Sequence, residues 1–243
     1  MHLNIDYSSC LSKAKNFRQR FLILHYTAKD FQGSIASLTG PHVSVHYLVP
    51  TLQDIDPTYP HDSLKVYALV PEAERAWHAG DSQWGNRAEL NDSSIGIEIV
   101  NLTTDVQFQP YPDKQIELVI SLCQNILQRY PDITPNNVIG HSDISVGRKI
   151  DPGPMFPWFK LYQHGVGAWF DEVTVQEYTK QFTAKMPSKE DVISKLKDYG
   201  YNINVEDSLL FKAFQMHFRP ANYFGLLDVE TAAIAYALCD KYV

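Results

Sequence analysis

The feature that most limits how this chain can fold is a series of short β-rich segments in its first hundred residues. Four segments combine apolar runs or alternation with β-branched and aromatic residues, which predicts strands at Phe21–Thr27, Val43–Val49, Lys65–Val70 and Ser94–Val100. The stretches 54–62 and 86–93 are rich in loop-forming residues such as Pro, Asp and Asn, and predict loops. A sheet is therefore the expected centre of the fold.

One long amphipathic segment follows these strands. Apolar side chains recur there at helical spacing, at Ile116, Val119, Ile120, Cys123, Ile126, Leu127 and Tyr130. This predicts a helix over Asp113–Tyr130, which Pro112 suits at its start and Pro131 ends. A short apolar segment, Val138–Gly140, then leads into His141. Strands combined with a long helix indicate an α/β or α+β domain built on one sheet.

The sequence changes character near Met186, and only helical patterns follow. Ser188 and Asp191 resemble an N-cap arrangement, and Gly200 is suited to end the helix that they begin. Residues at helical spacing predict three short helices, marked by Val192, Ile193, Leu196 and Tyr199, by Leu209, Leu210, Phe214, His217 and Phe218, and by Ile234, Ala237 and Leu238. We therefore divide the chain into residues 1–186 and residues 187–243, and expect the smaller unit to dock on the larger.

Composition excludes several classes of protein. The 243 residues are 44% hydrophobic, which suffices for a packed core and excludes a disordered chain. Lys and Arg number 21 against 28 Asp and Glu, and the net charge of −7 argues against a nucleic-acid binder that relies on phosphate contacts. No apolar run approaches the roughly 18 residues of a transmembrane helix, and the first residues lack a signal-peptide pattern.

The three cysteines, Cys10, Cys123 and Cys239, lie far apart and form no Cys-x-x-Cys pair. This excludes a cysteine-rich zinc module and a disulfide-dense scaffold. We expect three unpaired thiols, and one disulfide with an odd thiol is the alternative.

Candidate metal ligands lie at the ends of predicted strands. His25 is near the end of the first strand, His141 follows Val138–Gly140, and Asp151 lies in a loop stiffened by Pro and Gly. Two imidazoles and one carboxylate, with a fourth position left for water, form a catalytic zinc arrangement. The same set also suits a non-haem iron oxygenase, so the spacing leaves the metal open.

Six motifs occur in the order found in a known family: Leu24–Thr27, Val45–Pro50, Ala76–Gly80, Asn91–Ile99, Gly140–Ile144 and Arg148–Pro154. Together they resemble the zinc-dependent N-acetylmuramoyl-L-alanine amidases of the amidase-2 type, which are related in fold to peptidoglycan recognition proteins. The resemblance covers about residues 20–170. It implies a mixed central β-sheet flanked by helices, with zinc in a surface groove.

The C-terminal unit carries a resemblance of its own. Four segments resemble the peptidoglycan-binding module of the AmiD-type members of the family: Tyr199–Tyr201, Ala213–Pro220, Gly225 and Asp228–Thr231. This implies a small three-helix domain that anchors the enzyme to the wall or completes the groove.

The resemblance implies that His25, His141 and Asp151 bind one zinc ion and that Glu98 and Lys149 form the catalytic pair. Zinc lowers the pKa of its bound water towards ~7, which supplies hydroxide at neutral pH. Glu98 can accept the proton of the water and pass it to the leaving amine. Lys149 can stabilise the oxyanion of the tetrahedral intermediate.

Other roles for these residues stay open. Glu98 can instead belong to a structural ion pair, and the neighbouring Arg148 competes with Lys149 as the cation of the site. Four residues are candidate substrate contacts: His46, His78, Arg87 and Asn91. Of these, His46 either lines the site or fixes a loop, and His78 either contacts substrate or has a packing role. Five further histidines have no chemical context: His2, His42, His61, His164 and His217.

The expected reaction is hydrolysis of the amide between N-acetylmuramic acid, or its 1,6-anhydro form, and L-alanine of a peptidoglycan stem peptide. A recycling amidase for soluble anhydro-muropeptides is the near alternative, although the C-terminal module favours an envelope enzyme. A non-catalytic peptidoglycan recognition protein is disfavoured because every catalytic and ligand position is filled. A non-haem iron oxygenase shares only the ligand set.

The expected partners are peptidoglycan or muropeptides and not nucleic acid, and the expected state is a monomer. The AmiD-type enzymes are exported and lipid-anchored, which predicts a periplasmic protein at the outer membrane whose leader is missing from this sequence. A cytoplasmic location is the alternative. Cys10 has no apolar run before it, so we do not expect it to be the lipidated residue.

Overall fold

The computed structural model describes residues 2–104 and 107–243, and its centre is a five-stranded sheet in the order β3-β2-β6-β1-β7. The strands are β1 (Phe21–Tyr26), β2 (Tyr47–Val49), β3 (Tyr67–Ala68), β6 (Ser94–Ile99) and β7 (Val138–Gly140). β1 runs parallel to β6 and β7, and β2 runs parallel to β6, whereas β3 is antiparallel to β2. The predicted mixed sheet is confirmed.

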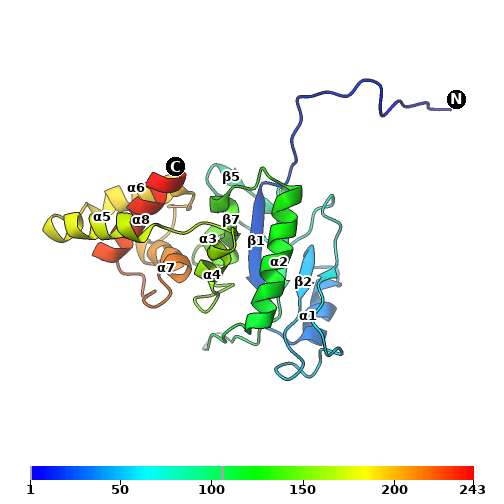
Figure 1. Ribbon diagram of the computed structural model, residues 1–243, viewed down its shortest axis with the longest axis horizontal. Helices are drawn as coiled ribbons and strands as arrows, with labels where there is room; N and C mark the ends of the chain where they lie inside the picture. Colours follow the sequence, from blue (N-terminus) through cyan, green and yellow to red (C-terminus); the bar gives the residue numbers. More distant parts are fainter. Residues whose placement is uncertain (1, 105–106) are drawn as a thin grey trace.

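The long helix α2 (Asp113–Arg129) lies along one face of this sheet (Figure 1). Its buried stripe consists of Ile116, Val119, Ile120, Cys123 and Ile126, which are the apolar positions that predicted the helix. On β1, Leu22, Ile23 and Leu24 are fully buried, as expected for a central strand covered on both faces.

Several strand boundaries differ from those predicted. β2 begins only at Tyr47, because Ser44 N donates to Trp77 O in a loop contact outside the sheet. The predicted loop 86–93 contains a short strand, β5 (Arg87–Ala88), which forms a hairpin with β4 (Gln83–Trp84) just before it. The hairpin turns at Gly85, whose φ of 58° favours glycine.

The sequence analysis also missed short helices. α1 (Phe31–Leu38) follows β1 and is capped by Asp30, whose side chain accepts from Gly33 N. α3 (His141–Ile144) follows β7 directly, and α4 (Trp158–Gln163) comes next. Two 3₁₀ turns, at Leu90–Asp92 and Pro135–Asn137, complete this part of the chain.

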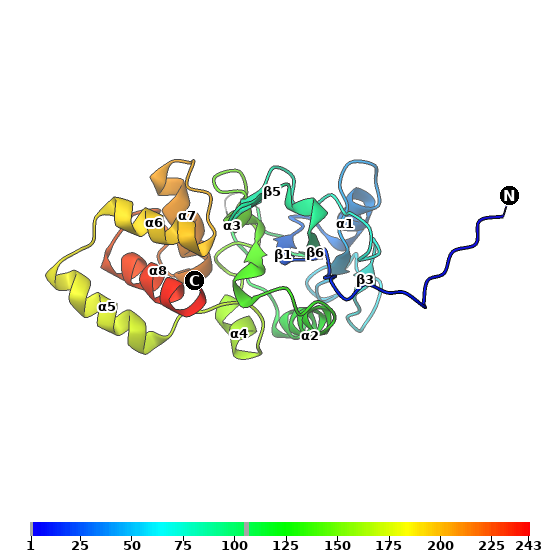
Figure 2. The same ribbon diagram turned by 90° about the horizontal axis from the view of Figure 1, so that it is seen from above.

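Four helices group at one end of the molecule, beside α3 and α4 (Figure 2). They are α5 (Glu172–Ala184), α6 (Lys189–Tyr199), α7 (Asp207–Phe218) and α8 (Val229–Tyr242), of which the last three were predicted. α5 precedes residue 187 but packs on α8, where Tyr178 donates to Asp240 at 2.6 Å. The division at residues 186 and 187 stays a prediction.

The two parts of the chain share one apolar core. Leu22 and Ile97 of the sheet belong to the same cluster of buried side chains as Phe214 and Leu238 of the C-terminal helices. The three cysteines are unpaired, as predicted. Among the described residues, no helix combines the length and apolar character needed to span a bilayer.

Candidate active site

The predicted site residues meet at the carboxyl ends of the parallel strands. His25 on β1 is paired in register with Glu98 on β6, so both side chains lie on the same face of the sheet. His141 is the first residue after β7, which pairs with the other edge of β1. The loop after α3 then brings Asp151 to the same place. Strand ends of this kind are the usual location of sites in open α/β sheets.

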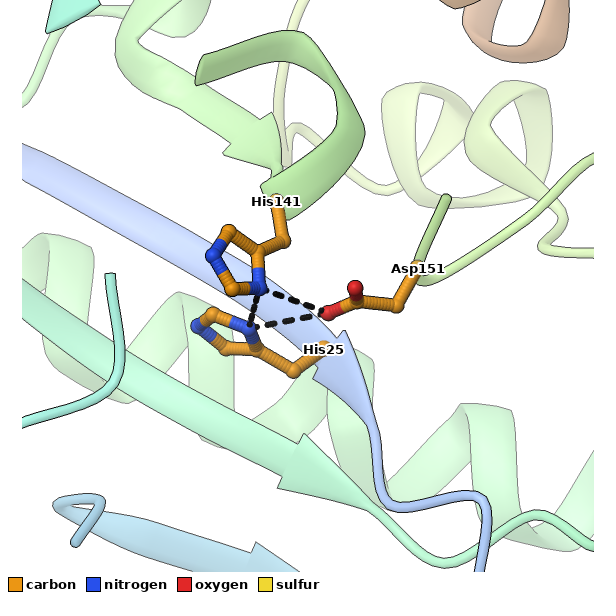
Figure 3. Close-up of side chains that lie close together, drawn as sticks. All are labelled: His25, His141 and Asp151. Carbon is orange, nitrogen blue, oxygen red and sulfur yellow. Dashed lines mark hydrogen bonds and ion pairs between the residues drawn. The ribbon is translucent and has the colours of Figure 1, made fainter. Parts of the chain in front are cut away.

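Three buried donor atoms converge in a triangle (Figure 3). His25 Nδ1 lies 3.0 Å from both His141 Nδ1 and Asp151 Oδ2, and His141 Nδ1 lies 3.1 Å from Asp151 Oδ2. If each imidazole is neutral and its proton is on the distal nitrogen, none of these contacts is a hydrogen bond. The three lone pairs then face one point, which is the arrangement of a metal site.

The distal nitrogen of His141 supports that protonation state. His141 Nε2 lies 3.0 Å from Ala79 O, and a carbonyl oxygen can only accept a hydrogen bond. Nε2 therefore carries the proton, and Nδ1 presents its lone pair to Asp151 and His25. A backbone carbonyl commonly fixes metal-binding histidines in this way.

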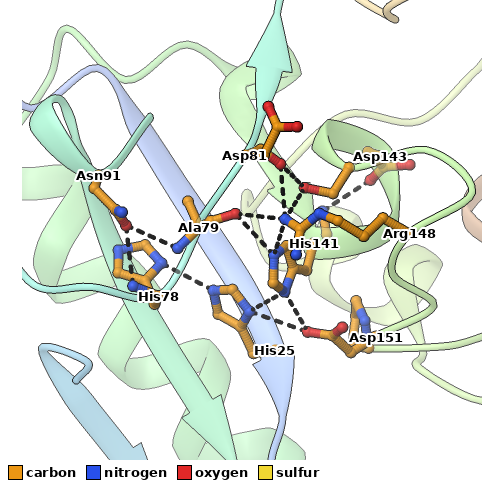
Figure 4. Close-up of polar contacts among 12 residues, drawn as sticks. His25, His78, Ala79, Asp81, Asn91, His141, Asp143, Arg148 and Asp151 are labelled. Atoms are coloured by element: carbon orange, nitrogen blue, oxygen red, sulfur yellow. Dashed lines mark hydrogen bonds and ion pairs between the residues drawn. The ribbon is translucent and has the colours of Figure 1, made fainter. Parts of the chain in front are cut away.

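A relay of hydrogen bonds fixes the proton on His25, and its last contact, between His78 and His25, is drawn in Figure 4. Ser94 Oγ donates to Leu90 O at 2.6 Å, so it accepts from His78 Nε2 at 3.3 Å. His78 Nδ1 is then an acceptor, and His25 Nε2 donates to it at 3.0 Å. His25 Nδ1 is left unprotonated and faces the other two donor atoms.

The electrostatics of the triangle agree with this assignment. Burial lowers the pKa of His25 to about 4, so its imidazole is neutral at pH 7. Although burial alone raises the pKa of Asp151, positive charge on His141 or His25 would hold it well below the usual range, so the carboxylate stays ionised beside either form of the rings. The site thus combines one anionic and two neutral ligands.

Glu98 and Lys149 occupy the same cavity. Glu98 Oε2 is buried and has no hydrogen-bond partner among the described residues. Burial, with the charge of Asp151, raises the pKa of Glu98 well above its usual value, and Lys149 opposes this shift. Glu98 therefore has a free carboxylate oxygen, and it forms no ion pair within the described part of the chain.

Arg148 is held by its own surroundings. Its Nη2 atom lies 2.7–3.0 Å from Ala79 O, Asp81 O and Ser145 Oγ. Lys149 Nζ, in contrast, has no hydrogen-bond acceptor within residues 2–104 and 107–243. Of the two neighbouring cations, Lys149 is the one available to a ligand.

An open cavity of about 490 Å³ is lined by residues described above, including Glu98, His141, Arg148, Lys149 and Asp151. Its walls come from the end of β1 and the turn after it, helix α1, residues 43–44 and 77–78, and the loop 148–151. Trp77 stands at the rim and is 54% exposed. The cavity can admit a ligand with apolar and polar parts.

Comparison with known proteins agrees with this geometry. Residues 15–154 match the model of the Amidase_2 family, described as N-acetylmuramoyl-L-alanine amidase. The chain belongs to this family. Over 236 residues it is 44% identical to the N-acetylmuramoyl-L-alanine amidase AmiD of Escherichia coli, which covers 93% of this chain and 84% of that protein.

Two solved structures share the whole architecture of this amidase. AmpDh3 of Pseudomonas aeruginosa matches with a TM-score of 0.95 at 50% identity, covering 99% of both chains. AmiD of E. coli, in complex with the substrate anhydro-N-acetylmuramic acid-L-Ala-D-γ-Glu-L-Lys, matches with a TM-score of 0.86 at 41% identity, covering 96% of this chain and 93% of that one. The predicted activity and fold class are confirmed.

The predicted substrate contacts of the amidase are spread over different surroundings. His78 lines the cavity, whereas His46, Arg87 and Asn91 do not belong to its lining. His46 bridges Gly96 N and Glu74 O, at 3.0 and 3.2 Å. Asn91 Oδ1 accepts from the backbone of His78 and Ala79 at 3.0 and 2.8 Å. Arg87 lies on β5 and lines separate hollows.

Sequence reasoning missed Ser94 as a member of the site. It stands at the start of β6 and looks like an ordinary strand residue, but it orients His78 and through it His25. The closeness of Gly96 to His78 is the one signal of this contact, because a Cβ at position 96 would lie 2.6 Å from the His78 ring. This contact can be recognised only in the folded structure, where the loop that carries His78 lies against Gly96.

Proposed function

We propose that His25, His141 and Asp151 hold a zinc ion and that Glu98 and Lys149 carry out the amide hydrolysis beside it. The observation that carries this proposal is the triangle of donor atoms whose protons are directed elsewhere, His141 Nε2–H to Ala79 O and His25 Nε2–H to His78. Two neutral imidazoles and one carboxylate are a ligand set that zinc accepts readily, with a position left for water.

A bound zinc ion would supply an acidified water and polarise the scissile carbonyl. Glu98 would accept a proton from the attacking water and deliver it to the nitrogen of the leaving L-alanine. Its unpartnered Oε2 atom suits this role, because no structural bond must break before the proton arrives.

Lys149 would donate to the carbonyl oxygen as this oxygen becomes negatively charged. Its ammonium is free of competing acceptors in the described part of the chain, and it lines the same cavity as Glu98. Fixed positive charge at a developing oxyanion stabilises the transition state more than the substrate.

The substrate that we propose is a muramyl peptide with an ordinary or a 1,6-anhydro end. The E. coli relative was solved with anhydro-N-acetylmuramic acid-L-Ala-D-γ-Glu-L-Lys, and it is similar to this chain over almost its whole length. The open cavity, with the exposed Trp77 ring at its rim, fits an extended glycan–peptide. We assign His78 to the support of His25, and His46 and Asn91 to the fixing of loops.

The place of action that we propose is the cell envelope, with residues 187–243 as a peptidoglycan-binding domain of a monomeric enzyme. The similarity to AmiD includes these C-terminal helices. Activity on intact sacculi, compared with activity on soluble anhydro-muropeptides, separates this role from cytoplasmic recycling.

Metal removal tests the central proposal. The protein is treated with a chelator, and the chelator is then removed by gel filtration. The treated protein should no longer hydrolyse anhydro-N-acetylmuramyl-L-alanine peptides, and one equivalent of zinc should restore this activity. Full activity in metal-free protein would overturn the zinc mechanism. Recovery with ferrous iron and not with zinc would favour the iron chemistry that the same ligand set allows.

A further inference from the structure

A buried polar cluster joins the C-terminal helices to the metal-binding region. Asp143 lies on α3, two residues after His141, and its side chain is fully buried (Figure 4). Its Oδ1 accepts from the Tyr201 hydroxyl at 2.7 Å, and its Oδ2 accepts from His217 Nδ1 at 2.7 Å. Both donors belong to the C-terminal part of the chain.

The same carboxylate holds the backbone beside the ligands. Asp143 Oδ2 also accepts from Gly140 N at 2.8 Å, which fixes the residue directly before His141. Ser142 N, in the same turn, donates to Asp151 O at 2.8 Å. Asp143 thus fixes the residue before His141, and its chain neighbour Ser142 is bonded to the backbone of Asp151.

His217 is placed for this one contact. Its ring stacks on Trp158 of α4 with 3.9 Å between centroids, and its Nδ1 donates to Asp143. Its other nitrogen, Nε2, is buried with no hydrogen-bond partner among the described residues. A buried polar atom without a partner is unfavourable, so apolar packing alone does not account for a histidine at this position.

Two further contacts tie the C-terminal helices to the same region. Leu209 of α7 packs on Gly147, where a Cβ would lie 2.8 Å from its side chain. Gly85 N, in the β4–β5 turn, donates to Gly200 O at 2.7 Å. The C-terminal helices therefore contact α3, the loop that leads to Asp151 and the β4–β5 turn.

We propose that Tyr201 and His217 are positioning residues of the metal centre, acting through Asp143 on the backbone that carries His141 and Asp151. The C-terminal helices then complete the catalytic site, whatever else they bind. This inference rests on the proposed metal ligation by His141 and Asp151.

Zinc affinity of the full chain tests the proposal, measured by competition with a chromophoric chelator at pH 7. Tyr201→Phe removes one hydroxyl, and His217→Leu removes the donor to Asp143. Each should raise the Kd for zinc by about tenfold, as loss of supporting contacts does in other metal sites. His217→Asn, whose amide can replace the Nδ1 donor, should restore the Kd to within about threefold of wild type.

Tyr199→Phe is the matched control. Tyr199 packs against Trp84, as Tyr201 does, but within the described residues its hydroxyl makes no hydrogen bond to Asp143, so its loss should leave the Kd for zinc unchanged. Unchanged zinc binding in Tyr201→Phe and His217→Leu, or equal weakening in Tyr199→Phe, would overturn the positioning role. Failure of the wild-type chain to bind zinc would instead overturn the metal assignment itself.

Discussion

At the scale of single residues, Glu98 is the side chain on which turnover depends most directly in the proposed mechanism. Glu98→Gln keeps the shape but cannot accept a proton, so kcat should fall about 10²- to 10⁴-fold while the Kd for zinc stays unchanged. Because burial raises the pKa of Glu98, the acid limb of kcat/KM in the wild type should lie above pH 4.5. A Glu98→Gln variant that keeps more than a tenth of wild-type kcat would remove Glu98 from the mechanism.

Acid should destabilise the metal-free protein through His25. Its pKa is about 4 in the folded state against 6.5 for an ordinary histidine, so the unfolded state binds more protons between these values. Stability is then complete above pH 6.5 and is lost as the pH falls towards 4, by at most about 3 kcal/mol for this group. Urea unfolding at several pH values measures this, and His25→Gln should flatten the profile. An equally steep profile in the variant would show that other groups cause the loss.

His78 should matter for metal affinity although it is not a ligand. Without its ring, His25 Nε2 loses its acceptor and the proton is free to move to Nδ1. His78→Ala should therefore raise the Kd for zinc about 10- to 100-fold, and Ser94→Ala should have a smaller effect in the same direction. His42→Ala, at an exposed position outside the site, is the control. Unchanged zinc binding in His78→Ala would leave His78 as a substrate contact.

The proposed ligand residues could be identified from the sequence, whereas the residues that support them could not. His25 and His141 stand at strand ends and Asp151 in a loop of Pro and Gly, which are local features of the chain. The interactions of Ser94 with His78, and of His217 with Asp143, join distant segments, with 74 positions between the last two. The sequence around His217 gives no indication that Asp143 is its partner, so the sequence predicts no chemical role for this histidine.

At the scale of elements, strand β6 owes part of its role to Gly96. The His78 ring lies over this residue, and a Cβ there would come within 2.6 Å of it. Gly96→Ala should therefore displace His78, lower the free energy of unfolding by about 2 kcal/mol, and weaken zinc binding. Gly40→Ala, in the turn after α1, should leave zinc binding unchanged. Normal zinc affinity in Gly96→Ala would show that the ring has room to shift.

The sequence predicted best those elements whose buried side chains follow a regular pattern along the chain. α2 and β1 bury one continuous stripe or run, and they appear close to their predicted bounds. β2 is shorter than its alternating sequence because the backbone before Tyr47 bonds to loops rather than to a neighbouring strand. α1 is only eight residues long and contains Gly33, so its apolar periodicity is too short to stand out.

At the scale of the whole molecule, the shared core should make unfolding cooperative. Leu22 and Ile97 of the sheet and Phe214 and Leu238 of the C-terminal helices belong to one cluster of buried side chains. Calorimetry of the full chain should show one transition, whose calorimetric and van't Hoff enthalpies agree. Tryptophan fluorescence should report the same midpoint. Two resolved transitions would mean that residues 187–243 unfold independently.

The wide sequence separation of the ligands has a consequence for biogenesis. His25 and Asp151 are 126 positions apart in the sequence, although His25 Nδ1 and Asp151 Oδ2 are separated by only 3.0 Å. His25 therefore emerges from the ribosome long before Asp151. A nascent chain cannot assemble the complete ligand set until the loop after α3 has emerged. Domains fold largely in the order of synthesis, and α7, which carries His217, emerges later still. If these residues hold the metal as proposed, loading is a late event in the synthesis of this polypeptide, and a truncated translation product would lack part of the ligand set.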